Sequence, residues 1–149
     1  MLAMKKIHWE NTEKKRDDFD ELIPCIEKAF LLTFPEDFKT CAIENGGGSP
    51  SPCRFNVENK KEKKFTKLLS LNPRSKDFFW RHYVAAGWHP LGYRGDPYPI
   101  AQDAEGNYIC LDYEGCYPPK IVYVTAKWAT TGWKTIISDS FSAFLKMLY

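Results

Sequence analysis

The chain has 149 residues, the size of one ordinary domain; 44% of them are hydrophobic and 27% are charged. This balance excludes a disordered tail, a fibrous protein and a membrane-spanning chain. The net charge is only +2 and the pI is about 8.2, so the chain lacks the strongly basic signature of nucleic-acid-binding proteins. We therefore expect one domain over residues 1–149 that binds no nucleic acid directly.

The cysteines indicate a reducing compartment. The chain has 5 of them, an odd number without a Cys-x-x-Cys pair, which argues against a disulfide framework and a zinc knuckle. The N-terminus lacks the apolar segment of a signal peptide, and no run of about 18 apolar residues occurs anywhere. We expect a cytoplasmic protein without a membrane span.

The first predicted helix covers residues 11–30. Apolar residues such as Phe19, Ile23 and Ile26 recur there at three- and four-residue steps. Pro24 interrupts the pattern, so that either one helix kinks at this residue or a second helix begins with it.

The second predicted helix begins near Pro35. Thr33 and Glu36 have the spacing of a capping box, and proline is favoured in a first helical turn. Phe38 belongs to its buried stripe, and the glycines at 46–48 end the helix because glycine accepts the left-handed conformation of a C-cap. Residues 49–52 are predicted to form a short loop.

The middle of the chain mixes strand and helix signals. Residues 54–57 and 65–71 are predicted strands, separated by the lysine-rich segment 59–64. Residues 77–86 are predicted to form an aromatic-rich helix that ends at Gly87.

The C-terminal third predicts an antiparallel meander followed by a helix. Residues 98–102 and 108–113 flank a glycine-bearing hairpin loop, and residues 120–125 form a third strand. Ser140 is a predicted N-cap, followed by a stripe at three- and four-residue steps. Helices first, then a sheet, then a closing helix predict an α+β domain. Its predicted core is Phe38, Ile109, Leu111, Phe141, Phe144 and Leu145.

The opening helices resemble those of the SUKH superfamily, which includes Smi/Knr-type cell-wall regulators and bacterial toxin-immunity proteins. Members open with an Ile-Glu helix, continue with a Leu-Pro-x-x-Tyr-Lys helix and end that helix at Asn-Gly-Gly. Here residues 26–39 contain Phe34-Pro35 and Phe38-Lys39 in place of Leu-Pro and Tyr-Lys, and Asn45-Gly46-Gly47 matches directly.

The second half of the chain resembles the same family. Residues 100–112 are similar to its Ile-x-x-x-x-x-Gly-x-x-Ile-Cys-x-Asp hairpin, and residues 140–145 to its closing Ser-Phe-x-x-Phe-Leu helix. Residues 49–97 carry no such motif. The His-Glu pair that many members have after the third strand is absent, and Ala126-Lys127-Trp128 occupies that region. The resemblance implies an α+β fold that binds a protein partner, and any role of the missing pair is in doubt.

Residue types used in catalysis occur without a recognisable motif. A metal site built from His82, His89, Cys110 and Cys116 would lack the short paired spacings of zinc sites. The glycines at 46–48 end a helix and precede no Gly-Lys-Ser/Thr, which argues against a phosphate-binding loop. We expect no catalytic residue, no metal and no cofactor, although a Cys–His pair assembled only by the fold stays open.

Two runs of charged residues are predicted to lie on the solvent-exposed surface. Residues 59–67 hold five lysines and one glutamate, and Asp17, Asp18, Asp20 and Glu21 surround one apolar residue. A solvent-facing loop and the outer face of the first helix account for these two runs.

Aromatic residues make up 15% of the chain, and many of them, including four of the five tryptophans, crowd into residues 78–133. We expect most of them in the core, while Trp and Tyr side chains that stay partly exposed are the usual anchors of protein interfaces. Carboxylates beside such anchors would add specificity. The predicted partner-binding surface comprises Trp88, Tyr93, Asp112, Glu114, Trp128 and Trp133.

The function that the sequence favours is a non-catalytic binding module, and the resemblance to the SUKH superfamily implies an immunity protein that binds a toxin domain and blocks it. One alternative is a small-ligand-binding protein or enzyme that uses the aromatic middle segment as a pocket. Another is the cell-wall-assembly role of the family's Smi/Knr-type members. The sequence gives no basis for choosing an oligomeric state.

Overall fold

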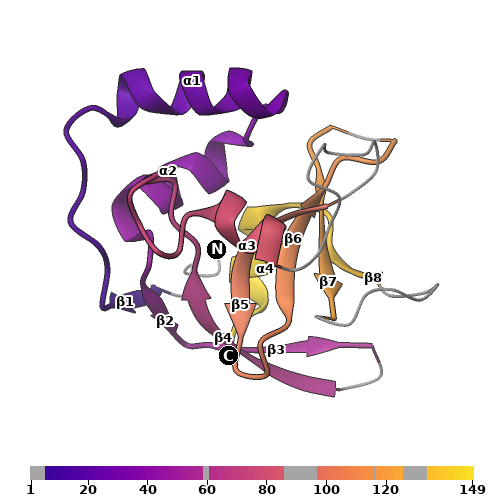
Figure 1. Ribbon diagram of the computed structural model, residues 1–149. Coiled ribbons are helices and arrows are strands. Elements are labelled where there is room, and N and C mark those ends of the chain that lie inside the picture. The colour runs from indigo at the N-terminus through magenta and orange to yellow at the C-terminus, as the bar shows by residue number, and fades with distance from the viewer. Residues whose placement is uncertain (1–5, 59–60, 86–96, 116, 126–133) are drawn as a thin grey trace, which may run out of the picture.

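Helices lie on both sides of a central sheet (Figure 1). The computed structural model describes residues 6–58, 61–85, 97–115, 117–125 and 134–149. The predicted α+β class is confirmed, with helices at both ends of the chain and the sheet between them. Within the described ranges the helices are α1 (Phe19–Phe30), α2 (Glu36–Asn45), α3 (Phe79–Ala85) and α4 (Phe141–Met147).

The strands form two antiparallel sheets. A two-stranded sheet pairs β1 with β2, and a six-stranded sheet has the order β3-β4-β5-β6-β7-β8, so that strands adjacent in sequence are adjacent in space. The strands are β1 (His8–Glu10), β2 (Ser49–Ser51), β3 (Arg54–Val57), β4 (Lys61–Leu68), β5 (Tyr98–Asp103), β6 (Tyr108–Asp112), β7 (Lys120–Val124) and β8 (Lys134–Ser138).

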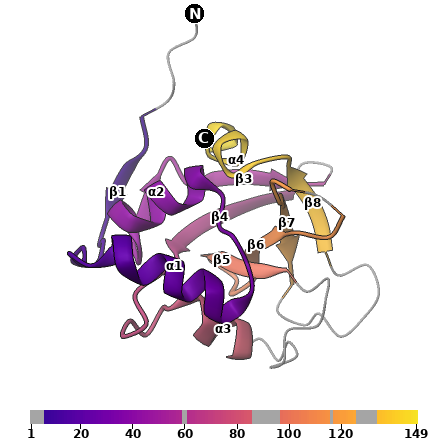
Figure 2. The ribbon, with the colours of Figure 1, turned by 90° about the horizontal axis from the view of Figure 1, so that it is seen from above.

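Both faces of the large sheet are covered at its centre. All five residues of β6 are buried, although alternate side chains point to opposite faces. Tyr108 and Tyr123 point to opposite faces because of the register between β6 and β7. The Phe55 ring contacts both Tyr123 and Phe144 of α4, whereas His82 of α3 contacts Tyr108. Figures 1 and 2 show α4 and α3 on opposite sides of the strands.

One hydrophobic cluster joins the helices to the sheet. Among the six residues predicted for the core, Leu145 is half-buried against this cluster, and the other five are buried within it. Aromatic rings dominate: Phe38 of α2 meets Phe141 of α4 at 5.4 Å between ring centroids, and Phe144 meets Phe65 at 5.9 Å. Within the described residues, every helix is too short or too polar to cross a bilayer.

Helix α1 begins at Phe19, later than predicted. It is one continuous helix that contains Pro24, so no second helix begins there. Leu31 ends it in the left-handed conformation, with φ 56° and ψ 46°. The prediction of helix over residues 11–18 was wrong.

Tertiary contacts hold this earlier segment in an extended path. The Glu13 N–H donates to the Gly46 carbonyl at 2.9 Å, and the Glu13 carboxylate accepts hydrogen bonds from the hydroxyls of Ser70 and Ser75. Gly47 has φ +79°, and a Cβ there would lie 2.6 Å from Glu13 Cγ. The predicted glycine turn after α2 is therefore also a contact for the N-terminal segment, a role that local pattern does not reveal.

The predicted capping box at the start of α2 is absent. Pro35 is the N-cap residue, and it makes no side-chain cap bond. The Phe34 N–H donates instead to Glu27 Oε2 of α1 at 2.6 Å, and the side chain of Glu36 turns toward Lys39. The Glu36 side chain, which a capping box would turn back to the Thr33 N–H, therefore pairs with Lys39 instead.

The main errors in the strand prediction concern exposed or short strands. The predicted loop at 49–52 contains β2, whose partner β1 was not predicted, and residues 61–64 of the lysine-rich connector are part of β4. Strand β8 was also missed, since its residues are half-buried or exposed and show no clear alternation. The predicted strand at 54–57, the hairpin, the third strand and the aromatic helix agree with β3, β5–β6, β7 and α3 to within a few residues.

Replacing Phe144 with alanine tests this core. Phe144 is fully buried and contacts both Phe55 and Phe65. We expect Phe144→Ala to lower the free energy of unfolding by about 3–5 kcal/mol, measured by urea denaturation. Met147→Ala is the control on the same helix: its side chain is exposed, so the expected change is below about 0.5 kcal/mol. Equal effects of the two substitutions would contradict this packing.

Candidate protein-binding surface

The two carboxylates predicted for the partner-binding surface share one lysine. Asp112 ends β6 and is 7% exposed, while Glu114 lies exposed in the following loop. Lys134 Nζ lies 2.9 Å from Asp112 Oδ2 and 2.5 Å from Glu114 Oε2. The Lys134 ammonium lowers the pKa of the Glu114 carboxyl. The structure thus brings these carboxylates together, and the lysine balances one of their two charges.

The aromatic part of that predicted surface lies outside the described residues, so its place beside the two carboxylates stays a prediction. It comprises Trp88, Tyr93, Trp128 and Trp133.

Two tyrosines near Glu114 were not singled out in the sequence. The Tyr113 hydroxyl donates to the Thr33 carbonyl at 2.6 Å, which ties the loop after β6 to the connection between α1 and α2. The Tyr117 ring stacks on Tyr113 at 6.4 Å and is 62% exposed. Burial raises the pKa of Tyr113, so its hydroxyl stays protonated and keeps this bond. An exposed ring on a buried, hydrogen-bonded ring forms a fixed aromatic surface.

A continuous series of aromatic ring contacts connects Tyr117 to Phe30 of α1. Successive centroids lie 4.3, 4.5, 5.7, 5.8 and 6.4 Å apart, and all but the first distance fall within the range of about 4.5–7 Å for favourable aromatic pairs. The series passes from α1 through α3, β5 and the end of β6 to the following loop. Its members are Phe30, Trp80, Tyr83, Tyr98, Tyr113 and Tyr117.

A groove beside Tyr117 separates this loop from the starts of α2 and α4. Its volume is about 320 Å³, and its apolar walls are formed by Tyr117, Pro118, Pro119, Pro35 and Phe141. Residues from three distant parts of the chain meet here, so no local motif marks the groove. The only sequence signal is the Tyr-Pro-Pro run between two predicted strands.

The Asp37 carboxylate forms part of the groove and joins α2 to α4. Its Oδ2 accepts hydrogen bonds from the Ser142 N–H at 2.9 Å and from the Ser142 hydroxyl at 2.8 Å. Its Oδ1 accepts from the Phe38 N–H at 2.8 Å. Ser140, confirmed as the N-cap, accepts from the Ala143 N–H at 3.1 Å. One carboxylate therefore serves the first turns of both helices.

Further carboxylates lie at the edge of the groove. Glu36 has an 86% exposed side chain, and its Oε1 lies 2.8 Å from Lys39 Nζ. Glu27 Oε2 lies 3.9 Å from the same nitrogen, and its side chain is 15% exposed. The hydrogen bond that Lys39 donates to Glu36 raises the pKa of Lys39, although burial acts in the opposite direction. Lys39 thus pairs with Glu36 and lies near Glu27, while Glu36 and Asp37 are the two carboxylates that line the groove.

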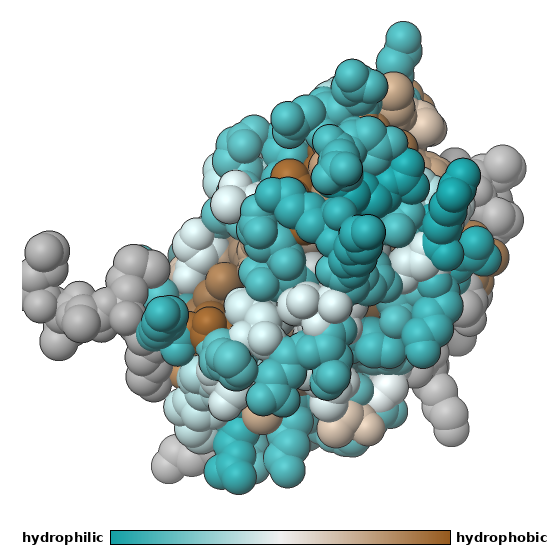
Figure 3. Space-filling view, turned by 90° about the vertical axis from the view of Figure 1, so that its left-hand side faces the viewer, coloured by the Kyte–Doolittle hydropathy of each residue, from teal (hydrophilic) through white to brown (hydrophobic). Residues whose placement is uncertain are grey.

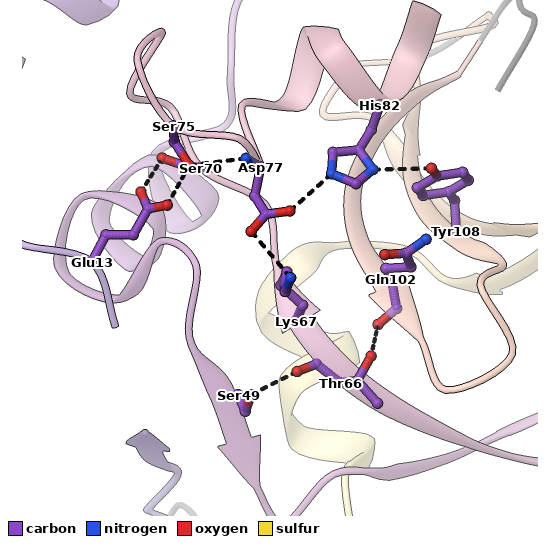
Figure 4. Close-up of polar contacts among 10 residues, drawn as sticks. All are labelled: Glu13, Ser49, Thr66, Lys67, Ser70, Ser75, Asp77, His82, Gln102 and Tyr108. Atoms are coloured by element: carbon purple, nitrogen blue, oxygen red, sulfur yellow. Dashed lines mark hydrogen bonds and ion pairs between the residues drawn. The ribbon is translucent and has the colours of Figure 1, made fainter. Parts of the chain in front are cut away.

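A separate polar chain fastens α3 to the other face of the sheet (Figure 4). Lys67 Nζ lies 3.1 Å from Asp77 Oδ2, and Asp77 Oδ1 lies 3.1 Å from His82 Nε2. His82 Nδ1 is 3.0 Å from the Tyr108 hydroxyl. Burial opposes ionisation of Asp77, but its hydrogen bonds with Lys67 and His82 outweigh this and lower its pKa. Both ring nitrogens of His82 are thus engaged, and the arrangement joins helix to sheet.

Two of the four cysteines that the structure describes, Cys41 and Cys110, lack the features of nucleophiles. Burial raises the pKa of the Cys41 thiol to about 11, and it raises the pKa of Cys110 well above its usual value. Among the described residues, no three histidine, cysteine or acidic side chains gather closely enough to hold a metal ion. Two residues of the metal site considered from the sequence, His89 and Cys116, lie outside the residues that the structure describes.

The acidic run near α1 faces solvent. Asp17, Asp18, Asp20 and Glu21 are all exposed, and Asp18 pairs with Arg16 at 2.7 Å. The side of the molecule that carries α1 and β1 is mainly hydrophilic, with apolar residues only in small separate patches (Figure 3). This face therefore lacks the apolar area that a stable interface needs at its centre.

A comparison with protein-family models identifies the family to which this chain belongs. The model of a family described as SUKH_6, SMI1-KNR4 cell-wall, matches residues 9–145. The chain belongs to the SUKH superfamily. The match spans all four described helices as far as Leu145 and includes residues 49–97, where the sequence motifs gave no indication. No curated protein matches this SUKH chain.

The link between α2 and α4 provides a test of this site. Asp37→Ala removes all three accepted hydrogen bonds, so we expect the free energy of unfolding to fall by about 1–2 kcal/mol in urea denaturation. Asp139→Ala removes an exposed carboxylate directly before the Ser140 cap and should change it by less than about 0.5 kcal/mol. If Asp37→Ala is no less stable than Asp139→Ala, the carboxylate does not hold the helices together.

Proposed function

We propose that this SUKH chain is a non-catalytic binding module, an immunity protein that binds a cognate toxin domain and blocks it. The observation that carries the proposal is the family match over residues 9–145, since the superfamily was identified above by motifs shared with toxin-immunity proteins. The groove and the exposed Tyr117 beside it support a role in binding.

The state of the reactive side chains supports a role without catalysis. Cys41 and Cys110 are thiols at neutral pH, because burial raises their pKa values. His82 is held between Asp77 and Tyr108. A general base needs a free nitrogen that reaches a substrate proton, and these contacts occupy both nitrogens of His82.

The surface has room for such a partner. A standard interface covers about 800 Å² on each protein, roughly a tenth of the 8879 Å² that the chain exposes. The described rings of the aromatic middle segment pack against one another and against Phe30, as core aromatics do. This packing favours the binding module over a ligand pocket in that segment.

A second candidate function is cell-wall-assembly regulation, because the matching family is itself described by the cell-wall proteins SMI1 and KNR4. The two functions make different predictions. An immunity protein protects a cell from a toxin encoded beside its own gene, whereas a regulator changes wall composition without any toxin.

Co-expression tests the immunity function and the absence of catalysis together. The toxin domain encoded beside this gene is expressed with the chain, and colony counts report protection. We expect Cys41→Ala, Cys110→Ala and His82→Gln to protect as well as the unsubstituted chain wherever circular dichroism shows a folded protein. A folded variant that loses protection would show that the substituted group takes part in chemistry. No protection by the unsubstituted chain would contradict the immunity function.

An alanine scan tests the aromatic surface predicted from sequence. Trp88, Trp128 and Trp133 are replaced singly, and affinity for the same toxin domain is measured by calorimetry. We expect at least one substitution to weaken binding by about 2 kcal/mol, the size of a hot spot. Unchanged affinity in all three variants would remove these tryptophans from the interface.

A further inference from the structure

We propose that the groove between Tyr117 and the start of α2 binds an arginine side chain on a basic face of the partner protein. The guanidinium would lie over the Tyr117 ring and pair with the Glu36 carboxylate. This proposal rests on the proposed function, because it assigns a surface and a contact chemistry to the binding of a toxin domain.

The size of the groove favours a single side chain. Pockets for small molecules and cofactors usually have volumes of about 300–1,000 Å³, and this groove, at about 320 Å³, lies at the lower limit. Its apolar walls suit a long aliphatic stem, and the exposed Tyr117 ring offers a flat face at its rim. A planar cation stacked on such a ring gains about 0.5–2 kcal/mol, depending on its desolvation.

The local charge favours a cation. The described lining of the groove includes the carboxylates of Glu36 and Asp37 and no lysine or arginine, although the whole chain has a net charge of +2. Glu36 is the carboxylate most available to a partner, since its side chain is 86% exposed. Lys39 would keep a partner in Glu27, whose side chain is as sheltered as its own.

The hydrogen-bonding groups of the walls favour a ligand that brings donors. Pro35, Pro118 and Pro119 have no N–H group, so these wall residues offer a ligand no backbone donor. Arginine has five N–H donors in a planar arrangement that matches a carboxylate, and it is more weakly hydrated than lysine. Arginine is also enriched among the residues that dominate interface energies.

An anion is the obvious competitor, because α2 and α4 both begin at this groove and helix N-termini attract negative charge. The Asp37 carboxylate already occupies that role, since it accepts hydrogen bonds from N–H groups in the first turns of both helices. A second anion would meet Asp37 and Glu36 at close range. The same carboxylates that repel an anion attract a guanidinium.

Calorimetry with the toxin domain encoded beside this gene tests the proposal on the full chain. We expect Tyr117→Ala and Glu36→Arg each to weaken binding by about 30-fold, the equivalent of a 2 kcal/mol hot spot at 1.4 kcal/mol per factor of ten. Tyr117→Phe keeps the ring and should stay within about threefold of the unsubstituted chain. Asp20→Arg reverses an exposed carboxylate on α1 and is the matched control, with an expected change below about threefold.

A charge exchange identifies the partner group. Arginines on the toxin domain are replaced singly with glutamate, and we expect one such variant to bind Glu36→Arg more tightly than it binds the unsubstituted chain. If the unsubstituted chain binds the toxin domain but Tyr117→Ala and Glu36→Arg bind equally well, the groove proposal is overturned and the immunity function stands. If the unsubstituted chain does not bind the toxin domain, the proposed function falls, and the groove proposal with it. Tighter binding of the toxin domain by Glu36→Arg would show that the groove meets an anion and would also overturn the proposal.

Discussion

The fold depends on a meeting between α2 and α4, helices whose contact residues Asp37 and Ser142 lie 105 positions apart in the sequence. The Asp37 carboxylate receives hydrogen bonds from the first turns of both helices, and directly below it Phe38 packs against Phe141. An isolated helix of seven residues such as α4 would not be stable in water. The Asp37 carboxylate accepts hydrogen bonds from the first turn of α4, and the Phe38–Phe141 contact buries the apolar side of this helix. Asp37 and Phe141 also line one wall of the groove.

The groove has its position because the aromatic series fixes its other wall. Tyr117 is exposed, yet its ring rests on Tyr113, which is hydrogen-bonded to the connection between α1 and α2. An exposed aromatic residue on a flexible loop would lose conformational freedom on binding, and this loss would weaken the complex. A ring already held by a buried neighbour loses less, so Tyr117 is suited to act as a binding residue.

Local pattern was sufficient for elements whose stability is decided by their own residues. The spacing of Phe141, Phe144 and Leu148 after Ser140 predicted α4 and its cap, and the glycine-bearing hairpin placed β5 and β6. Elements that depend on distant partners were missed. Strand β1 exists because β2 pairs with it, and residues 11–18 are not helical because Glu13 reaches Ser70 and Ser75.

The residues of the candidate site also divide into those that local pattern predicted and those that depend on distant partners. Asp112 and Glu114 were predicted as carboxylates beside aromatic anchors, but no local pattern indicates that Lys134 neutralises one of their charges. Glu36 and Asp37 begin α2 and Tyr117 lies in the loop after β6, so only the tertiary fold brings them to one groove. Net charge was also a poor guide, because a chain with an overall charge of +2 carries a local excess of carboxylates.

Hydrogen exchange with mass spectrometry, on the chain alone and bound to its proposed toxin partner, tests the central claim most directly. The account predicts slower exchange in the complex at the start of α2 and in the loop between β6 and β7, with no change along α1. Slower exchange along α1, with unchanged exchange on both sides of the groove, would show that the partner binds elsewhere and would contradict the account.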